Sequence, residues 1–172
     1  HGQGTVTVPS GYKDRTGYGA NSLATKAYVD AQTQGLDVKD SVTLGTTAAL
    51  AALTYSQSNG TLTGTGNASI NASSGLGQSV TLGVNDRVLV KNQAEARQNG
   101  IYKVTTVGGS ESFVLTRADD ANVAADLTGG SFTFVEEGTN ANNGYVFTHS
   151  GTPTLDNATL SNNTELPISQ FS

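Results

Sequence analysis

The sequence has no cysteine, no methionine and few charged residues. Without cysteine, disulfides and thiolate metal sites are excluded, so stability must come from packing and backbone pairing. Because methionine is absent and His1 comes first, we expect a processed or trimmed form. The net charge is −5 and no cluster of Lys and Arg occurs, so no nucleic-acid partner is expected. No apolar run is long enough for a bilayer, so no membrane insertion is expected.

Glycine and small polar residues take the place of the missing charges. The chain of 172 residues holds 21 glycines and is rich in Ser, Thr, Asn and Ala, while 35% of its residues are hydrophobic. This composition favours a β-rich chain with many turns over a helical bundle. The second half still contains enough Val, Leu, Ile, Phe and Tyr for a core. The length suits one domain with an extension.

The first 35 residues differ from the rest of the chain. Residues 1–21 are glycine-rich and are predicted to be an extended arm, which stays disordered or docks on a neighbour. Residues 22–35 are predicted to form one short α-helix, because Asn21 or Ser22 can cap it, good helix formers follow and Gly35 supplies a stop.

One face of this helix is a candidate oligomer interface. Ala24, Tyr28 and Ala31 recur at spacings of four and three residues, and Leu23 can contribute at the edge. A helix this short is marginal alone. A seam in a helical oligomer and a helix packed on its own domain both fit the pattern.

Residues 36–172 are predicted to form a β-rich domain. Strands are expected at residues 38–44, 61–63, 69–71, 80–82, 87–91, 101–107, 112–117, 130–136 and 144–149. A turn is expected at Asn99-Gly100, and residues 46–55 fit either a short helix or a buried strand. Short strands separated by Gly and Asn predict an antiparallel β-sandwich or barrel-like module, preceded by the arm and the helix.

Alternation within these strands predicts which side chains share a face. One face is expected to carry Val38, Asp40, Val42 and Leu44. Others pair Phe113 with Leu115, Phe132 with Phe134, and Tyr145 with Phe147. Residues 118–128 are expected to be a crossing loop with a helical turn. Ile168 and Phe171 are expected to dock the polar tail.

No group of residues indicates catalysis. Asp119-Asp120 and Glu136-Glu137 are adjacent pairs, and neighbours on a strand point to opposite faces. Neither pair has the Asp/Asn ladder of a calcium loop. His149 is the only internal histidine and is expected at the surface or an interface. We therefore predict no catalytic, cofactor-binding or metal-binding residues, and no enzyme.

A carbohydrate site is the remaining possibility for small-molecule binding. Arg87, Tyr102, Tyr145 and Phe147 could form an exposed patch for stacking a sugar. The alternation of Tyr145 and Phe147 is more typical of a core. No residue list for a sugar site follows from the sequence.

Several ordered stretches resemble bacteriophage tail-fibre and virion appendage proteins. Residues 23–31 read LATKAYVDA, residues 86–93 DRVLVKNQ, residues 99–104 NGIYKV, residues 116–120 TRADD and residues 129–138 GGSFTFVEEG. The resemblance implies a structural or host-contact role in the virion, with no catalysis. It also implies a homotrimer, with the helix on the trimer axis. Residues 56–79 depart from the family pattern and read as an expanded loop region.

These observations lead to one expected function and two alternatives. We expect a tail fibre or fibre segment that attaches to the host by multivalent display. Residues 1–20 would attach to other virion proteins, and a host cell-surface glycan is a candidate partner. The alternatives are a capsid-surface decoration protein and a monomeric carbohydrate-binding module.

Overall fold

The computed structural model describes residues 37–77, 80–149, 153 and 166–171. The chain divides into two units, His1–Leu36 and Asp37–Ser172. The expected arm and helix, with Leu23, Ala24, Tyr28 and Ala31, therefore lie outside the described residues. The second unit is mainly β, as predicted, and its described helices are single 3-10 turns. None of those helices is long and apolar enough to cross a membrane.

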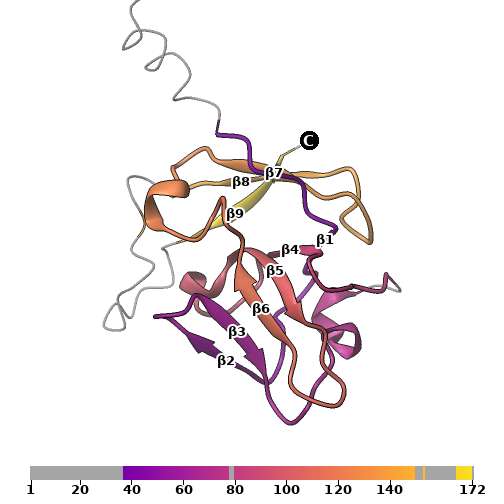
Figure 1. The fold of residues 1–172 in the computed structure, drawn as a ribbon. Helices are drawn as coiled ribbons and strands as arrows, with labels where there is room; N and C mark the ends of the chain where they lie inside the picture. The colour runs from indigo at the N-terminus through magenta and orange to yellow at the C-terminus, as the bar shows by residue number, and fades with distance from the viewer. Residues whose placement is uncertain (1–36, 78–79, 150–152, 154–165, 172) are drawn as a thin grey trace, which may run out of the picture. The chain divides into compact units, whose positions relative to one another are not determined.

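The strands form two sheets (Figure 1). The larger sheet has, in spatial order, β1 (Leu44–Gly45), β4 (Arg87–Val90), β5 (Gly100–Thr106), β6 (Val114–Arg117), β3 (Thr61–Gly64) and β2 (Leu53–Ser56). The smaller sheet has β7 (Phe132–Phe134), β8 (Gly144–Phe147) and β9 (Ile168–Phe171), all antiparallel. The larger sheet is mixed and not purely antiparallel, because β1 runs parallel to β4.

Side chains of the central strands are buried on both faces of the larger sheet. Val88 lies opposite Tyr102 and belongs to one hydrophobic cluster, whereas Leu89 lies opposite Ile101 and belongs to a second. Successive side chains on a strand point to opposite faces. A strand buried on both faces therefore reads as an unbroken apolar run, as residues 88–90 do.

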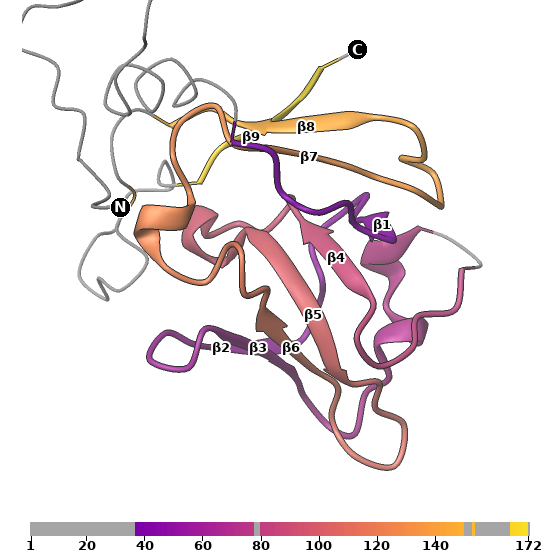
Figure 2. The same cartoon turned by 45° about the horizontal axis from the view of Figure 1, so that its top comes forward.

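The second cluster contains side chains from both sheets. Leu89 and Ile101 of the larger sheet share it with Val135, Tyr145 and Phe147 at the smaller sheet. Figure 2 shows β7 and β8 on the side of β4 and β5 where this cluster lies. The prediction that Tyr145 and Phe147 face a core is confirmed, because their exposed fractions are 3% and 0%.

Residues 37–45 run along both sheets. Val38 and Val42 form isolated parallel bridges to Phe132 and Val135, and β1 then pairs with β4. Because the chain changes sheets here, the predicted common face is wrong. Val38 is 56% exposed, whereas Val42 is fully buried.

The strands predicted at residues 69–71 and 80–82 are absent. Residues 70 and 71 belong instead to the 3-10 turn η2 (Ile70–Ala72), which is followed by η3 (Ser74–Leu76). Residues 80–82 form no strand, because the Asn71 side chain takes the place of a neighbouring strand. Its amide donates to the Leu82 carbonyl at 3.0 Å and its oxygen accepts from the Leu82 N–H at 2.8 Å. Residues 46–52 are neither helix nor strand, and β2 begins at Leu53.

The predicted turn at Asn99-Gly100 is also wrong. The connection turns earlier, in η4 (Ala96–Gln98), and Gly100 opens β5. Gly100 has a φ of +141°, and a Cβ at this position would collide with Arg117 Nη1. Glycine is therefore required by a long-range contact, not by a hairpin turn. The helical turn expected in residues 118–128 is η5 (Ala124–Asp126).

Candidate functional site

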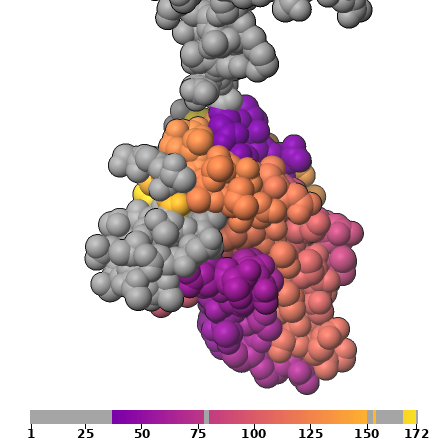
Figure 3. All heavy atoms as spheres, turned by 60° about the vertical axis from the view of Figure 1, so that its left-hand side comes forward, coloured from indigo at the N-terminus to yellow at the C-terminus, as the bar shows by residue number. Residues whose placement is uncertain are grey.

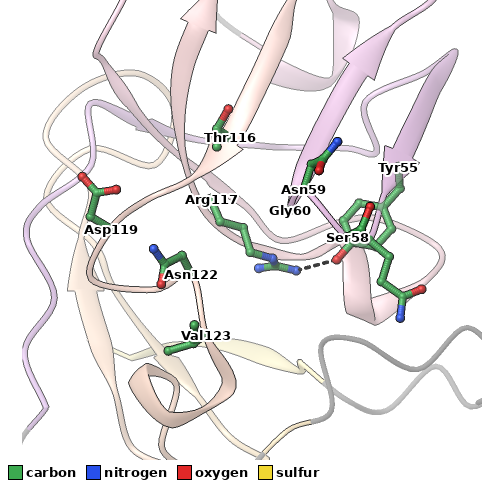
Figure 4. A pocket seen from close by; sticks show the side chains of 10 residues that line it. Tyr55, Ser58, Asn59, Gly60, Thr116, Arg117, Asp119, Asn122 and Val123 are labelled. Atoms are coloured by element: carbon green, nitrogen blue, oxygen red, sulfur yellow. Dashed lines mark hydrogen bonds between the residues drawn. The ribbon is translucent and has the colours of Figure 1, made fainter.

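A polar pocket opens between the β2–β3 hairpin and the segment that follows β6. Its volume is about 370 Å³. The pocket is lined by Tyr55, Gln57, Ser58, Asn59, Gly60, Thr116, Arg117, Asp119, Asn122 and Val123. Figure 3 shows the purple atoms of the hairpin region at the molecular surface, and Figure 4 shows the lining side chains.

The first wall is the turn of the hairpin. β2 and β3 pair from Leu53 with Gly64 to Ser56 with Thr61, which leaves residues 57–60 as the turn. The Gly60 carbonyl accepts a hydrogen bond from the Arg117 N–H at 2.9 Å, and Thr61 pairs with Thr116. Backbone pairing with β6 therefore fixes the turn beside the Arg117 side chain.

Arg117 is the buried centre of the site, with an exposed fraction of 3%. Its Nη1 donates to the Asn99 carbonyl at 3.1 Å, and its Nη2 donates to the Arg97 carbonyl at 2.6 Å and to the Tyr55 hydroxyl at 3.4 Å. The guanidinium carbon also lies 5.0 Å from the ring centroid of Tyr102 and 6.0 Å from that of Tyr55. Neutral carbonyls and two aromatic rings thus surround the cation.

No carboxylate among the described residues matches the charge of Arg117. In the part of the chain that the structure describes, no ion pair includes Arg117, and its buried Nε has no hydrogen-bond partner. Asp119 lines the pocket, but its side chain is 89% exposed and lies 3.7 Å from Lys103 Nζ. A buried guanidinium without an anion is unfavourable unless other groups or a ligand stabilise it.

Tyr102 supports the site from beneath. Its hydroxyl donates to the Gln98 carbonyl at 2.8 Å, which ties η4 to β5. Burial raises the pKa of Tyr102, although the charge of Arg117 opposes that shift. The phenol therefore stays neutral at physiological pH and remains a hydrogen-bond donor.

The second wall is the segment that follows β6. Asp120 anchors this segment through contacts with residues that do not line the pocket. Arg87 Nη2 donates to Asp120 Oδ1 at 3.0 Å and to Oδ2 at 2.9 Å, and the Asp40 N–H donates to Oδ2 at 3.0 Å. The Ala121 N–H closes a turn on the Ala118 carbonyl at 2.8 Å. This anchoring places Asp119, Asn122 and Val123 along the pocket.

The structure separates the other acidic and titratable candidates. Glu136 accepts a hydrogen bond from the Ser41 hydroxyl, while Glu137 is exposed. His149 is half-buried, and its Nε2 lies 2.8 Å from the Leu127 carbonyl. No group of three or more metal-ligating side chains occurs among the described residues.

The residues considered for a sugar-stacking patch do not form one at the surface. Tyr102, Tyr145 and Phe147 are all buried, and Arg87 is held by Asp120. The pocket uses Tyr55 instead, from a region whose pattern was ambiguous in the sequence. The stretch at residues 116–120 was the one signal near Arg117, but nothing in it indicated that the side chain would be buried without an anion.

A second feature is an aromatic face on the outer side of the smaller sheet. The rings of Phe132, Phe134 and Phe171 meet edge to face, with centroids 5.7 to 5.9 Å apart. Phe134 is 45% exposed and Phe171 39%. The predicted common face of Phe132 and Phe134 is confirmed, and it is this outer face.

Comparison with known proteins finds no family model, no curated protein and no solved structure that matches this chain. The resemblance to phage appendage proteins therefore stays a prediction.

Proposed function

We propose that the chain is a structural component of a bacteriophage particle, a tail fibre or fibre segment that takes part in host attachment. It acts without catalysis or a cofactor, as a homotrimer in the virion. Oligomerisation places several weak binding surfaces on one shaft, and avidity compensates for a low affinity at each site.

The observation that carries this proposal is a division of labour within the β-domain. Stretches that resemble phage appendage proteins contribute three adjacent strands: residues 86–93 include β4, residues 99–104 begin β5, and residues 116–120 end β6. The stretch that departs from the resemblance, residues 56–79, supplies the pocket wall at residues 57–60. A binding loop mounted on a rigid scaffold suits a protein that displays recognition surfaces.

The proposed architecture adds three parts to the two sheets. The sheets enclose the second hydrophobic cluster as a sandwich-like module. The helix at residues 22–35 forms the trimer seam through Leu23, Ala24, Tyr28 and Ala31. Residues 1–20 attach to other virion proteins.

A carbohydrate-binding module is the second candidate, and the polar pocket beside Tyr55 favours it. Such a module would be a monomer whose pocket works without avidity. The oligomeric state therefore separates the two candidates.

The test is the solution mass of the full chain by light scattering. We expect a trimer for the wild type and a monomer for Tyr28→Asp, because a charge in a helical seam of this size opposes association. Tyr18→Asp, in the arm, is the matched control and is expected to remain a trimer. A wild-type monomer would contradict the fibre proposal and favour the carbohydrate-binding module.

A further inference from the structure

We propose that the pocket around Arg117 binds a saccharide that carries a carboxylate, and that the carboxylate is attracted by the unmatched charge of Arg117. The inference rests on the proposed function in one respect, since the saccharide would be the host receptor. It goes beyond that function by naming the site and the chemistry of the receptor.

Arg117 carries a charge that no described carboxylate matches. Arg117 is 3% exposed, lines the pocket and contacts only neutral acceptors and aromatic rings in the described part of the chain. Figure 4 shows its guanidinium between Tyr55 on one side and the loop of Asn122 and Val123 on the other. An anionic ligand would supply the missing charge and a stronger, charge-assisted interaction.

The number of charges in the lining limits the anion. Arg117 is the only cation among the described residues that line the pocket, and Asp119 adds a negative charge at the rim. A phosphate or polyphosphate site would gather several cations or a set of backbone N–H groups at a helix start. One carboxylate matches one guanidinium more closely.

The remaining lining matches sugar hydroxyls. Gln57, Asn59 and Asn122 each offer an amide that can donate and accept hydrogen bonds, as each sugar hydroxyl also can. Ser58 and Thr116 add hydroxyls. The volume of about 370 Å³ lies in the range of small-molecule sites.

Two side chains offer apolar contact for the carbon skeleton of a sugar. Tyr55 is half-buried, and its hydroxyl accepts from Arg117 while its ring forms part of the lining. Val123 is 52% exposed on the opposite wall. An aromatic ring with a polar tip can pack on a sugar ring and still bond to water or ligand.

The experiment measures binding to the full chain by calorimetry and by saturation-transfer NMR. The probes are the methyl glycosides of glucuronate, galacturonate and N-acetylneuraminate. Each is paired with its neutral counterpart: the glucoside, the galactoside and the N-acetylneuraminate methyl ester. At least one acid is expected to bind about tenfold more tightly than its neutral partner, the usual gain from a hydrogen bond to a charged group.

Asn122→Asp tests the location of the site. It places a second carboxylate in an exposed lining position, and we expect it to weaken binding of the acid about tenfold. Ser110→Asp is the matched control, because it adds the same charge at an exposed position outside the pocket. Its affinity for the acid is expected to equal that of the wild type.

Three outcomes would overturn the inference: no binding of any acid, equal binding of acid and neutral partner, or equal weakening by both variants. Its failure is distinguishable from that of the fibre proposal. A trimer that binds no sugar would overturn the saccharide site alone. A monomer that binds an acidic sugar in this pocket would keep the site and contradict the fibre.

Discussion

The strands beneath the pocket and the rim around it differ in how deeply their side chains are buried. In the strands, Val88, Tyr102 and Leu115 are fully buried, whereas Asn122 and Val123 on the rim are exposed. The two regions meet at Arg117, whose backbone pairs with Tyr102 and whose side chain lines the pocket. Packing of the strands therefore fixes the position of Arg117, while the exposed rim residues can be substituted to suit a ligand without disturbing the core.

The largest expected effect is a difference in the free energy of unfolding between a substitution in the strands and one at the rim. Leu115→Ala removes a fully buried side chain from the first cluster and should lower the free energy of unfolding by about 2–5 kcal/mol. Val123→Ala removes an apolar side chain that is 52% exposed, and should change it by less than about 0.5 kcal/mol. Urea unfolding of both variants measures the difference. Equal losses would show that the rim is part of the core.

The next effect tests how closely the strands approach Arg117. Gly100→Ala should cost about 1–3 kcal/mol in strain, because its φ is +141°, and it should also displace the guanidinium that occupies the Cβ position. Gly109→Ala is the matched control: its φ is +117°, but no atom lies within 4 Å of a Cβ there. Urea unfolding should show a greater loss for Gly100→Ala.

Ligand affinity gives a second comparison between the two glycine variants. Gly100→Ala should weaken the binding of any ligand held by Arg117, whereas Gly109→Ala should leave the affinity unchanged. If both glycines lose equal stability and neither affects binding, the guanidinium moves freely and the strand does not position it.

Features encoded by consecutive residues are predicted correctly from the sequence, whereas features that depend on distant residues are not. Apolar and β-branched residues are concentrated in residues 87–91 and 101–107, which predicts two strands, and β4 and β5 do pair. Alternation over residues 38–44 predicts one strand with one face, since a pattern over a few residues carries no sign that the chain moves between sheets.

The pocket was missed because its parts are joined only by long-range contacts. Asn99-Gly100 has the composition of a hairpin turn, yet Gly100 is shaped by Arg117, which is 17 positions further along the chain. Tyr55 meets Arg117 across a still longer separation. Asn71 likewise replaces a strand partner with its side chain, which strand propensity does not register. The helix predicted at residues 22–35 remains a prediction.

The smallest expected effect concerns the link between the two regions, where adjacent aspartates give a matched pair. Asp120 binds Arg87 through both carboxylate oxygens and also accepts from the Asp40 N–H. Asp120→Asn should therefore lower the free energy of unfolding by about 1 kcal/mol, and by less at high salt, since the pair is partly exposed. Asp119→Asn loses only a contact of 3.7 Å at an 89% exposed side chain, so its stability should not change measurably.

Substitution of these two aspartates should change the affinity for an acidic sugar in opposite directions. Asp120→Asn loosens the wall that carries Asn122 and should weaken binding of an acidic sugar. Asp119→Asn removes a negative charge from the lining and should strengthen it. Calorimetric titration of both variants, with urea unfolding alongside, measures the two effects. If the two variants lose equal stability and equal affinity, Asp120 does not anchor the wall, and the rim is held in place by the backbone of residues 118–121 alone.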